Sequence, residues 1–251
     1  MVVNDTIRVQ RSHRSIRAFT DEPVADDIID VLMDVVAQAP TSSFYQQRTV
    51  IRVADPSVRE AIRQASGQPY VGGTRGELFI FVVDLYRNAQ IRAEAGLDNA
   101  VLESSALFLQ GIEDTLIAAQ NLVVAAESLK LGTVYLGSIG GDLRLVIEAL
   151  KLPERTFPLL GVLVGHPDQN PTLKPRLPQE FTVATDSYPR FENLHTALAD
   201  YDEVVRQYYD LRDASRPVDS FTRQIEAKPG LGRAEQEAIR EVLTEQRLAL
   251  Y

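Results

Sequence analysis

The apolar run Leu-Phe-Ile-Phe-Val-Val at residues 78–83 constrains the fold more than any other stretch of this 251-residue chain. Consecutive apolar residues that are rich in β-branched and aromatic side chains are typical of a strand buried on both faces. A sheet that contains such a strand must be covered on each side, and helices are the usual cover. The run therefore predicts a sheet that lies between layers of helices.

Weaker patterns predict the other elements. Further strands are expected at residues 49–53, 133–136 and 159–164. Capping residues and apolar spacing predict the helices. These span residues 4 to about 13, 23–39, 55–66, 106–131, 143–150, 201–211 and 234–250. Gly132 follows the longest helix, where a left-handed glycine commonly ends such an element. The alternation of helices and strands indicates the α+β class.

Composition excludes several classes of function. The formal net charge of −9 argues against nucleic acid and anionic membranes as partners. The absence of cysteine rules out disulfides, thiolate catalysis and cysteine-bound metal clusters, and the three histidines lack metal-ligand spacing. The N-terminus has no signal-peptide pattern, and charged residues interrupt the longest apolar helix. We therefore expect a soluble protein of the cytoplasm.

Residues 13–17, His-Arg-Ser-Ile-Arg, form a dense cluster of hydrogen-bond donors. The donors belong to His13, Arg14, Ser15 and Arg17. Guanidinium groups stay protonated and match phosphate oxygens bidentately, so the cluster favours an anion and a phosphate suits it best. The alternative, from this stretch alone, is a solvated charged turn between two helices.

Four further stretches carry polar groups that could face a ligand. They are the loop at residues 41–47, the strand end Tyr135-Leu136-Gly137-Ser138, Lys174 with Arg176 between prolines, and Arg212 with Arg216. In an extended backbone, Lys174 and Arg176 point to the same side. Each stretch also has a plain structural interpretation, as a turn, a strand end, a charged linker or a solvated helix end.

The usual catalytic groups are missing from the sequence. We find no nucleophile elbow, no carboxylate pair placed for acid–base chemistry, and no glycine fingerprint for a dinucleotide or a phosphate. A site made of cations and hydroxyls suits a bound cofactor that brings its own reactivity. The chain therefore indicates cofactor chemistry rather than side-chain chemistry.

Several motifs occur in an order that resembles one known group of proteins. They are His-Arg-Ser-Ile-Arg-Ala-Phe at 13–19, Ser-Ser-Phe-Tyr-Gln at 42–46, Gln68, Val-Tyr-Leu-Gly at 134–137, Lys-Pro-Arg-Leu-Pro at 174–178, and Tyr-Asp with Tyr-Tyr at 201–209. From about residue 7 to about 229, the chain resembles the oxygen-insensitive NADPH nitroreductases and NADPH–flavin oxidoreductases of the nitroreductase superfamily.

The resemblance implies an FMN-binding α+β fold with a central, mainly antiparallel sheet flanked by helices. It implies a single domain over residues 1–251, with a core at about 1–166 and an excursion at about 167–251. That excursion would embrace the partner of a homodimer, which would hold FMN non-covalently at two interface sites.

The same resemblance assigns the site residues. Those expected to bind FMN are His13, Arg14, Ser15, Arg17, Thr41, Ser42, Ser43, Gln68, Tyr135, Leu136, Gly137, Ser138, Lys174 and Arg176. Those expected to meet substrate or NADPH are Ser43, Phe44, Arg212, Arg216 and Lys228. Two positions depart from the family pattern, because Gly140 and Lys228 stand where it commonly has arginines.

The activity implied is two-electron, ping-pong transfer from NADPH through FMN to nitroaromatics, quinones or related acceptors. In this scheme FMN carries the hydride chemistry, and no metal or catalytic side chain is required. One alternative is an NADPH–flavin reductase that supplies reduced FMN to a partner. Another is a non-catalytic flavin-binding protein, although Lys174 and Arg212 favour an enzyme.

Overall fold

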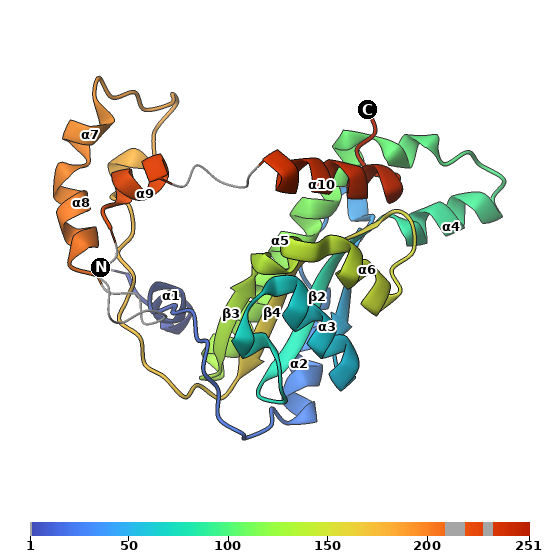
Figure 1. Cartoon of the computed structure of the whole chain (residues 1–251), viewed down its shortest axis with the longest axis horizontal. Helices are drawn as coiled ribbons and strands as arrows, with labels where there is room; N and C mark the ends of the chain where they lie inside the picture. Colours follow the sequence, from blue (N-terminus) through green and yellow to red (C-terminus); the bar gives the residue numbers. More distant parts are fainter. Residues whose placement is uncertain (1, 209–218, 228–232) are drawn as a thin grey trace. The chain divides into compact units, whose positions relative to one another are not determined.

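The computed structural model describes residues 2–208, 219–227 and 233–251. Its contacts divide the chain into two units (Figure 1). The first unit comprises Met1–Asn170 and Arg233–Tyr251, and the second comprises Pro171–Gly232. In the described residues, no helix is long and apolar enough to cross a membrane. The description of the chain as a single domain with an excursion stays a prediction.

One antiparallel sheet of four strands forms the centre of the first unit. Its order is β1 (Arg48–Arg52), β2 (Glu77–Asp84), β4 (Thr156–Gly165) and β3 (Gly132–Leu136). Ile80 of β2 lies opposite Gly161 of β4, and a register shift follows at Phe81 and Val82. The four strands predicted from the sequence are therefore present, with ends that differ by up to three residues.

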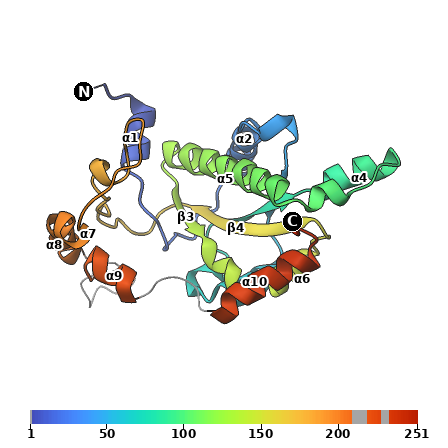
Figure 2. The same ribbon diagram turned by 90° about the horizontal axis from the view of Figure 1, so that it is seen from above.

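Strand β2 is buried on both faces, as its apolar run predicts. Phe79 and Phe81 face the core shared with α2 (Asp26–Ala37) and α5 (Ser105–Ser128). Leu78 and Ile80 face the opposite core. That core includes residues of α3 (Pro56–Ser66) and α6 (Leu143–Leu150). Figure 2 shows the sheet with α2 and α5 on one side and α6 on the other. The sheet between helical layers confirms the α+β fold.

Local sequence explains most helix ends. The side chain of Asn4 accepts a hydrogen bond from the backbone nitrogen of Ile7 and caps α1 (Asp5–Arg11). Asp55 caps α3 in the same way, and Pro56 occupies its first turn. Helix α2 begins at Asp26, so the expectation of a start at Pro23 was wrong.

The end of the longest helix also differs from the prediction. Helix α5 ends at Ser128, and Lys130 adopts the left-handed conformation, with φ 64°. Gly132 does not terminate the helix, because it is the first residue of β3. A Cβ atom there would lie 2.8 Å from three side-chain atoms of Ile16, so close packing requires the glycine.

The first unit also contains two further α-helices and a 3-10 helix. Helix α4 (Tyr86–Glu94) was not predicted, because only Ala89 is buried and no apolar stripe marks it. It precedes the 3-10 helix η3 (Ala100–Glu103). Helix α10 (Arg233–Glu245) lies near α6 (Figure 1). Arg144 of α6 contacts Glu241 and Glu245 of α10 at 2.9 and 2.6 Å.

The second unit contains short helices. They are η5 (Gln179–Phe181), α7 (Leu194–Ala197), α8 (Ala199–Arg206) and α9 (Phe221–Ala227). Asp202 joins α8 to α9, because its oxygens accept hydrogen bonds from the backbone nitrogen and the hydroxyl of Thr222 at 3.0 and 2.5 Å. Burial raises the pKa of Asp202, but the hydrogen bonds from Thr222 and Phe221, together with the nearby Arg206 charge, lower the pKa overall. Helix α8 begins near the predicted residue 201 and ends earlier than predicted.

Candidate functional site

The donor cluster at residues 13–17 lies along β3, an edge strand of the sheet. Ser15 forms a parallel bridge with Thr133, and the backbone nitrogen of Ile16 donates to the Thr133 carbonyl at 2.8 Å. On the other side, the backbone nitrogen of Asp168 donates to the Ala18 carbonyl at 2.9 Å. Ile16 is buried, whereas the four polar residues of the cluster are half-buried. The segment is thus held beside β3 by isolated bridges, with its four polar residues partly exposed.

A half-buried carboxylate orients the imidazole of this cluster. Glu127, near the end of α5, lies 2.6 Å from Nδ1 of His13. The hydroxyl of Thr133 donates to the same Glu127 oxygen at 2.7 Å. Glu127 thus fixes the orientation of the His13 ring, and it was not predicted as a site residue.

The two guanidinium groups retain unused donors. Arg14 donates from Nη1 to the Ser12 carbonyl at 2.9 Å, but its Nε is buried without a partner in the described structure. The Nε of Arg17 is buried and unpartnered in the same sense. A buried donor without a partner carries an energetic cost, which an anionic ligand would remove. The unpartnered donors are consistent with the predicted anion site, which stays a prediction.

Strand β3 leads from this cluster to the predicted residues at its other end. The Tyr135 hydroxyl donates to Oε1 of Gln120 at 3.0 Å. Burial, together with the nearby Glu127 carboxylate, raises the pKa of Tyr135 to about 12. Beyond the strand, a Cβ atom at Gly137 would meet nothing within 4 Å. The chain therefore leaves open space beside Gly137, where a ligand can approach the backbone.

The turn that contains Gln68 lies near this strand end. The 3-10 helix η4 (Gly137–Asp142) packs against the end of α3. A Cβ atom at Gly141 would stand 2.6 Å from the Ala65 carbonyl oxygen. Because Gln68 follows Ala65 by one turn, the fold brings Gln68, Tyr135–Ser138 and the cluster at 13–17 to the same edge of the sheet.

The loop at residues 41–47, called the serine loop from here on, has a separate anchor on α5. Both oxygens of Asp114 accept backbone hydrogen bonds, from Ser42 at 2.8 Å and from Gln47 at 3.0 Å. Three residues of this loop, Ser43, Phe44 and Gln46, have positive φ angles. Phe44 is 82% exposed. Such backbone strain persists only where surrounding contacts enforce it.

Asp114 was overlooked as a site residue, although a signal was present. It is a carboxylate within the apolar pattern of the 106–131 helix, and it is only 1% exposed. A buried carboxylate must be hydrogen-bonded, so its position predicts partners without identifying them. Those partners are backbone groups of a distant loop, which the sequence pattern does not reveal.

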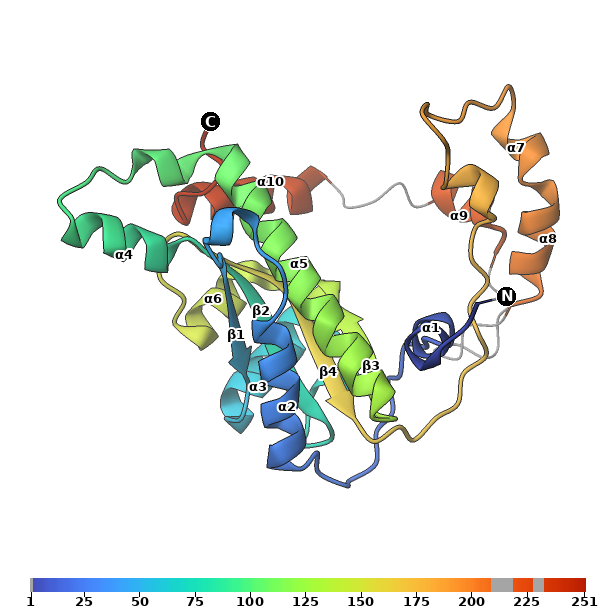
Figure 3. The ribbon, with the colours of Figure 1, turned by 180° about the vertical axis from the view of Figure 1, so that it is seen from behind.

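The predicted FMN residues of the first unit thus form two groups. Glu127 holds the group at residues 13–17, and Asp114 holds the group at residues 41–43. At 1.5 Å per residue, these two anchors are separated by about 20 Å along α5. Figure 3 shows how α5 runs along the sheet. Within one chain, the two groups are therefore held at positions far apart along α5.

The remaining predicted residues lie elsewhere. Lys174 and Arg176 belong to the second unit, where both are exposed on a segment outside helices and strands. The Tyr201 hydroxyl donates to the intervening Pro175 carbonyl at 3.4 Å. The predictions for Arg212, Arg216 and Lys228 concern positions outside the described residues.

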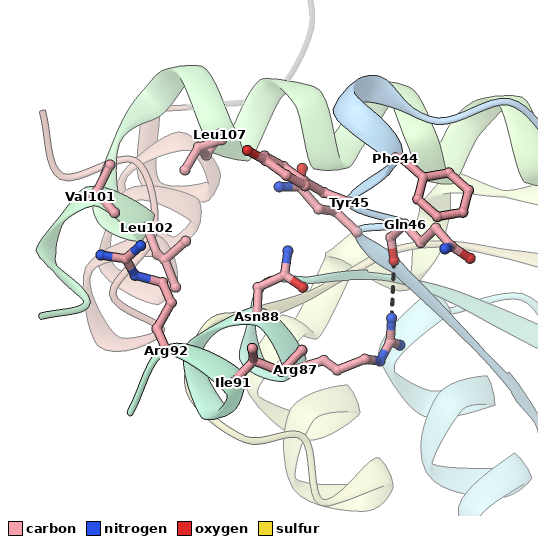
Figure 4. A pocket seen from close by; sticks show the side chains of 11 residues that line it. Phe44, Tyr45, Gln46, Arg87, Asn88, Ile91, Arg92, Val101, Leu102 and Leu107 are labelled. Carbon is pink, nitrogen blue, oxygen red and sulfur yellow. Dashed lines mark hydrogen bonds between the residues drawn. The ribbon is translucent and has the colours of Figure 1, made fainter. Parts of the chain in front are cut away.

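A cavity that the sequence did not indicate lies beside the serine loop (Figure 4). Its volume is about 740 Å³. The lining residues are Phe44, Tyr45, Gln46, Gln47, Arg87, Asn88, Ile91, Arg92, Val101, Leu102 and Leu107. Among the side chains that the structure describes, no group of three or more potential metal ligands is assembled.

Comparison with known sequences identifies the family. The Nitroreductase family profile matches residues 11–166, and the profile of the Nitroreductase family, C-terminal domain, matches residues 174–251. An NADPH-dependent oxidoreductase of Staphylococcus aureus is 37% identical over 221 residues, which cover 86% of this chain and 87% of that protein.

Solved structures agree with the sequence comparison. The NfrA1 nitroreductase of Bacillus subtilis has a TM-score of 0.88 and 31% identity, covering 98% of this chain and 100% of its own. The NADPH:FMN oxidoreductase of Vibrio harveyi, solved in complex with NAD+, has a TM-score of 0.85 and 34% identity, covering 99% and 100%. The chain belongs to the nitroreductase family, as its motifs indicated.

Proposed function

We propose that this protein is an NADPH-dependent oxidoreductase that binds FMN non-covalently and reduces nitroaromatics, quinones or related acceptors by two-electron, ping-pong transfer. The name of the Staphylococcus aureus relative supports the use of NADPH, and that of the Vibrio harveyi protein supports the use of both NADPH and FMN. The observation that carries the proposal is the pair of buried, unpartnered Nε atoms of Arg14 and Arg17.

The residues present fit FMN. Arg14, Arg17, Ser15 and His13 supply donors for a phosphate, because guanidinium forks match its oxygens. The open backbone at Gly137 admits a flat group. When bound, FMN supplies the hydride and electron-transfer chemistry that these side chains lack.

In this proposal, the protein's own residues bind FMN and orient one another around it. Glu127 holds the His13 ring, and Asp114 holds the serine loop so that Ser42 and Ser43 keep a fixed backbone. Gln68 and residues 135–138 bind FMN along the edge of the sheet. Lys174 and Arg176 supply further positive charge for an anionic ligand.

The separation of the two residue groups supports a homodimer with two shared sites. Residues 13–17 and 41–43 are anchored about 20 Å apart on one helix, by the helical rise. In a symmetric dimer, residues 13–17 of one protomer can meet residues 41–43 of its partner. The embrace by the C-terminal excursion and a location in the cytoplasm remain expectations of the same proposal.

The visible absorption spectrum of the purified protein tests the proposal. We expect a yellow protein whose flavin bands bleach when NADPH is added without oxygen. A colourless protein that takes up no added FMN would contradict it. Flavin bands that NADPH leaves unchanged would indicate a flavin-binding protein without this activity. Stopped-flow reoxidation with free FMN, compared with a nitro compound, separates a flavin reductase from a nitroreductase.

We predict that Arg212→Ala weakens the preference for NADPH over NADH. The 2′-phosphate of NADPH is the feature that a guanidinium can recognise, and one good charged contact is worth about tenfold in affinity. The measurement is the ratio of kcat/KM values for the two dinucleotides. Arg206→Ala is the control, because that side chain already pairs with Glu203 at 2.6 Å. An unchanged ratio for Arg212→Ala would remove this residue from the proposal, and Arg216 would be tested next.

A further inference from the structure

Residues 246–251 follow helix α10 and are called the strap from here on. Leu248 of the strap is fully buried and belongs to a core cluster that includes Phe108 of α5. Arg247 and Ala249, on either side of Leu248, have left-handed backbones with φ 54° and 51°. Residues other than glycine keep such a conformation only where their surroundings enforce it. The strap is therefore a fixed part of the first unit.

The strap contacts both ends of the 3-10 helix η3. The hydroxyl of Tyr251 donates to the carbonyl of Ala100, the first residue of η3, at 2.9 Å. The backbone nitrogen of Leu250 donates to the carbonyl of Glu103, the last residue of η3, at 2.7 Å. In the first turn of α5, the backbone nitrogen of Ser105 donates to the Tyr251 carbonyl at 2.7 Å. These bonds tie η3 to the strap on both sides.

A charged cluster reinforces this contact. The Glu103 side chain is only 12% exposed and accepts hydrogen bonds from Nε of Arg247 at 2.8 Å and from Nη2 of Arg155 at 3.0 Å. The backbone nitrogen of Arg155 also donates to the Gln246 carbonyl at 2.8 Å. Hydrogen bonds between charged groups are the stronger ones, and limited exposure to water reduces their screening. The last residue of η3 is thus held by two arginines, of which Arg247 belongs to the strap.

The two residues between the held ends of η3 line the cavity beside the serine loop. They are Val101 and Leu102, and Figure 4 shows them at the end of the cavity opposite Phe44. Arg92 also lines this end, but its Nε and Nη2 donate to the Asp98 carbonyl at 3.0 and 2.6 Å. The η3 wall therefore suits an apolar group. A cavity of about 740 Å³ extends well beyond a single aromatic ring that lies beside Phe44.

We propose that the strap selects electron acceptors by fixing η3, so that Val101 and Leu102 bind an apolar substituent of an aromatic acceptor whose ring lies beside Phe44. Among the lining residues that the structure describes, none belongs to the strap. The strap residues therefore act through η3 and are positioning residues. The inference rests on the proposed function, which assigns Phe44 to the substrate, and it narrows the acceptors to quinones or nitroaromatics that carry an apolar extension.

Hydrogen–deuterium exchange of the full-length protein measures how firmly the strap holds η3, and it needs no activity. Arg247→Gln removes the charged contact, and Tyr251→Phe removes only the hydroxyl. In the double variant, we expect the amides of residues 102–105 to exchange about tenfold faster, because local opening no longer breaks these hydrogen bonds. Arg247→Lys keeps the charge and should stay close to the wild type. Arg144→Gln is the matched control, because it removes the ion pairs between α6 and α10 but none with η3.

Stopped-flow reoxidation of the stoichiometrically reduced protein measures acceptor selection without NADPH. The probes are 1,4-naphthoquinone and 2-hexyl-1,4-naphthoquinone, which share the reacting ring and differ in an apolar substituent. We expect the wild type to react faster with the hexyl compound. The Arg247→Gln/Tyr251→Phe variant should lower this preference about threefold or more, which corresponds to the loss of about one buried methylene contact. Val101→Ser makes the η3 wall polar and should also lower it, whereas Arg144→Gln should leave it unchanged.

Three results would overturn the proposal. They are unchanged exchange at residues 102–105 in the double variant, a wild type without preference for the hexyl compound, and a preference that the double variant leaves unchanged or that Arg144→Gln lowers as much. Tyr251→Phe alone removes one oxygen atom from an exposed residue, so it replaces the double variant if that protein does not fold.

Failure of the proposed function has a different signature. A wild-type protein that holds no flavin, or whose reduced flavin neither quinone reoxidises, contradicts the proposed function and the inference together. An overturning result in a protein that does react with the quinones contradicts only the role of the strap.

Discussion

Two carboxylates on α5 organise the candidate site, although neither belongs to a recognisable motif. Asp114 binds both ends of the serine loop, and Glu127 orients His13. The sequence singled out the donors of the candidate site, because arginine, histidine and serine donors are conspicuous in a short segment. It did not predict these supporting carboxylates, because their partners lie far away along the chain and meet them only in the folded protein.

We predict that Asp114→Asn destabilises the protein by about 1–3 kcal/mol, because one acceptor is replaced by a donor that faces a backbone N–H group. Urea unfolding measures the change in the free energy of unfolding. Glu113→Gln, at an exposed position of the same helix, should change it by less than about 0.5 kcal/mol. If Asp114→Asn were as stable as the wild type, the anchoring role of Asp114 would be refuted.

Tyr135 provides a pH-dependent prediction. Its pKa is raised to about 12, whereas a tyrosine in an unfolded chain ionises near pH 10. The stability contribution is therefore complete below about pH 10 and is lost as the pH rises toward 12. Because Tyr135 is only partly buried, we expect a loss of roughly 1–2 kcal/mol over that range.

Tyr135→Phe should lose correspondingly less stability than the wild type between pH 10 and pH 12. Urea unfolding at several alkaline pH values measures the difference. Tyr86→Phe changes an exposed tyrosine and serves as the control. Parallel pH profiles for the wild type and Tyr135→Phe would show that this phenol is not selectively protected in the folded state.

At the scale of elements, strongly patterned segments were predictable and weakly patterned ones were not. The run at 78–83 and the helix at 143–150 appear as β2 and α6. Helix α4 escaped prediction because its large residues Tyr86 and Ile91 are exposed. The function of Gly132 was misassigned, because a glycine that follows a helix can serve either a helix end or close packing. Only the close contact between Ile16 and Gly132 in the folded protein distinguishes these two roles of the glycine.

Gly132→Ala should displace the segment at 13–17 from β3. The new Cβ would lie 2.8 Å from Ile16, and overpacking of this kind costs about 1–3 kcal/mol. We expect weaker FMN binding in fluorescence titrations as well as lower stability. Adding Ile16→Ala makes room, so the double variant should lose less than the sum of the two single changes. Gly137→Ala, where a Cβ meets nothing within 4 Å, tests whether any added methyl group has this effect on stability.

At the scale of the whole molecule, the division of the predicted site between Asp114 and Glu127 makes a prediction about two chains. If each site combines residues 13–17 of one protomer with 41–43 of its partner, an Arg17→Ala protomer and an Asp114→Asn protomer can complement each other. Their heterodimer contains one intact site. Random pairing in a symmetric dimer should therefore restore FMN binding at about a quarter of all sites.

Bound flavin in separately purified and co-expressed variants measures this complementation. Both single variants should bind FMN poorly, whereas the mixture should recover a measurable fraction. The absence of recovery, despite mixed dimers in native mass spectrometry, would show that each site is built from a single chain. Arg17 and Asp114, the two residues changed, both lie in the first unit.

The position of residues 15 and 16 beside β3 has a consequence for solubility. Strand β3, Gly-Thr-Val-Tyr-Leu, has neither charge nor proline, and an uncovered edge of this kind pairs readily with other chains. The opposite edge strand, β1, ends in the exposed Arg52, whereas Arg48 at its other end is buried and donates to the Val36 and Ala37 carbonyls. One edge is thus protected by charge and the other by the N-terminal segment. A chain that releases this segment removes the donors at residues 13–17 from the candidate site and exposes an aggregation-prone strand in the same event.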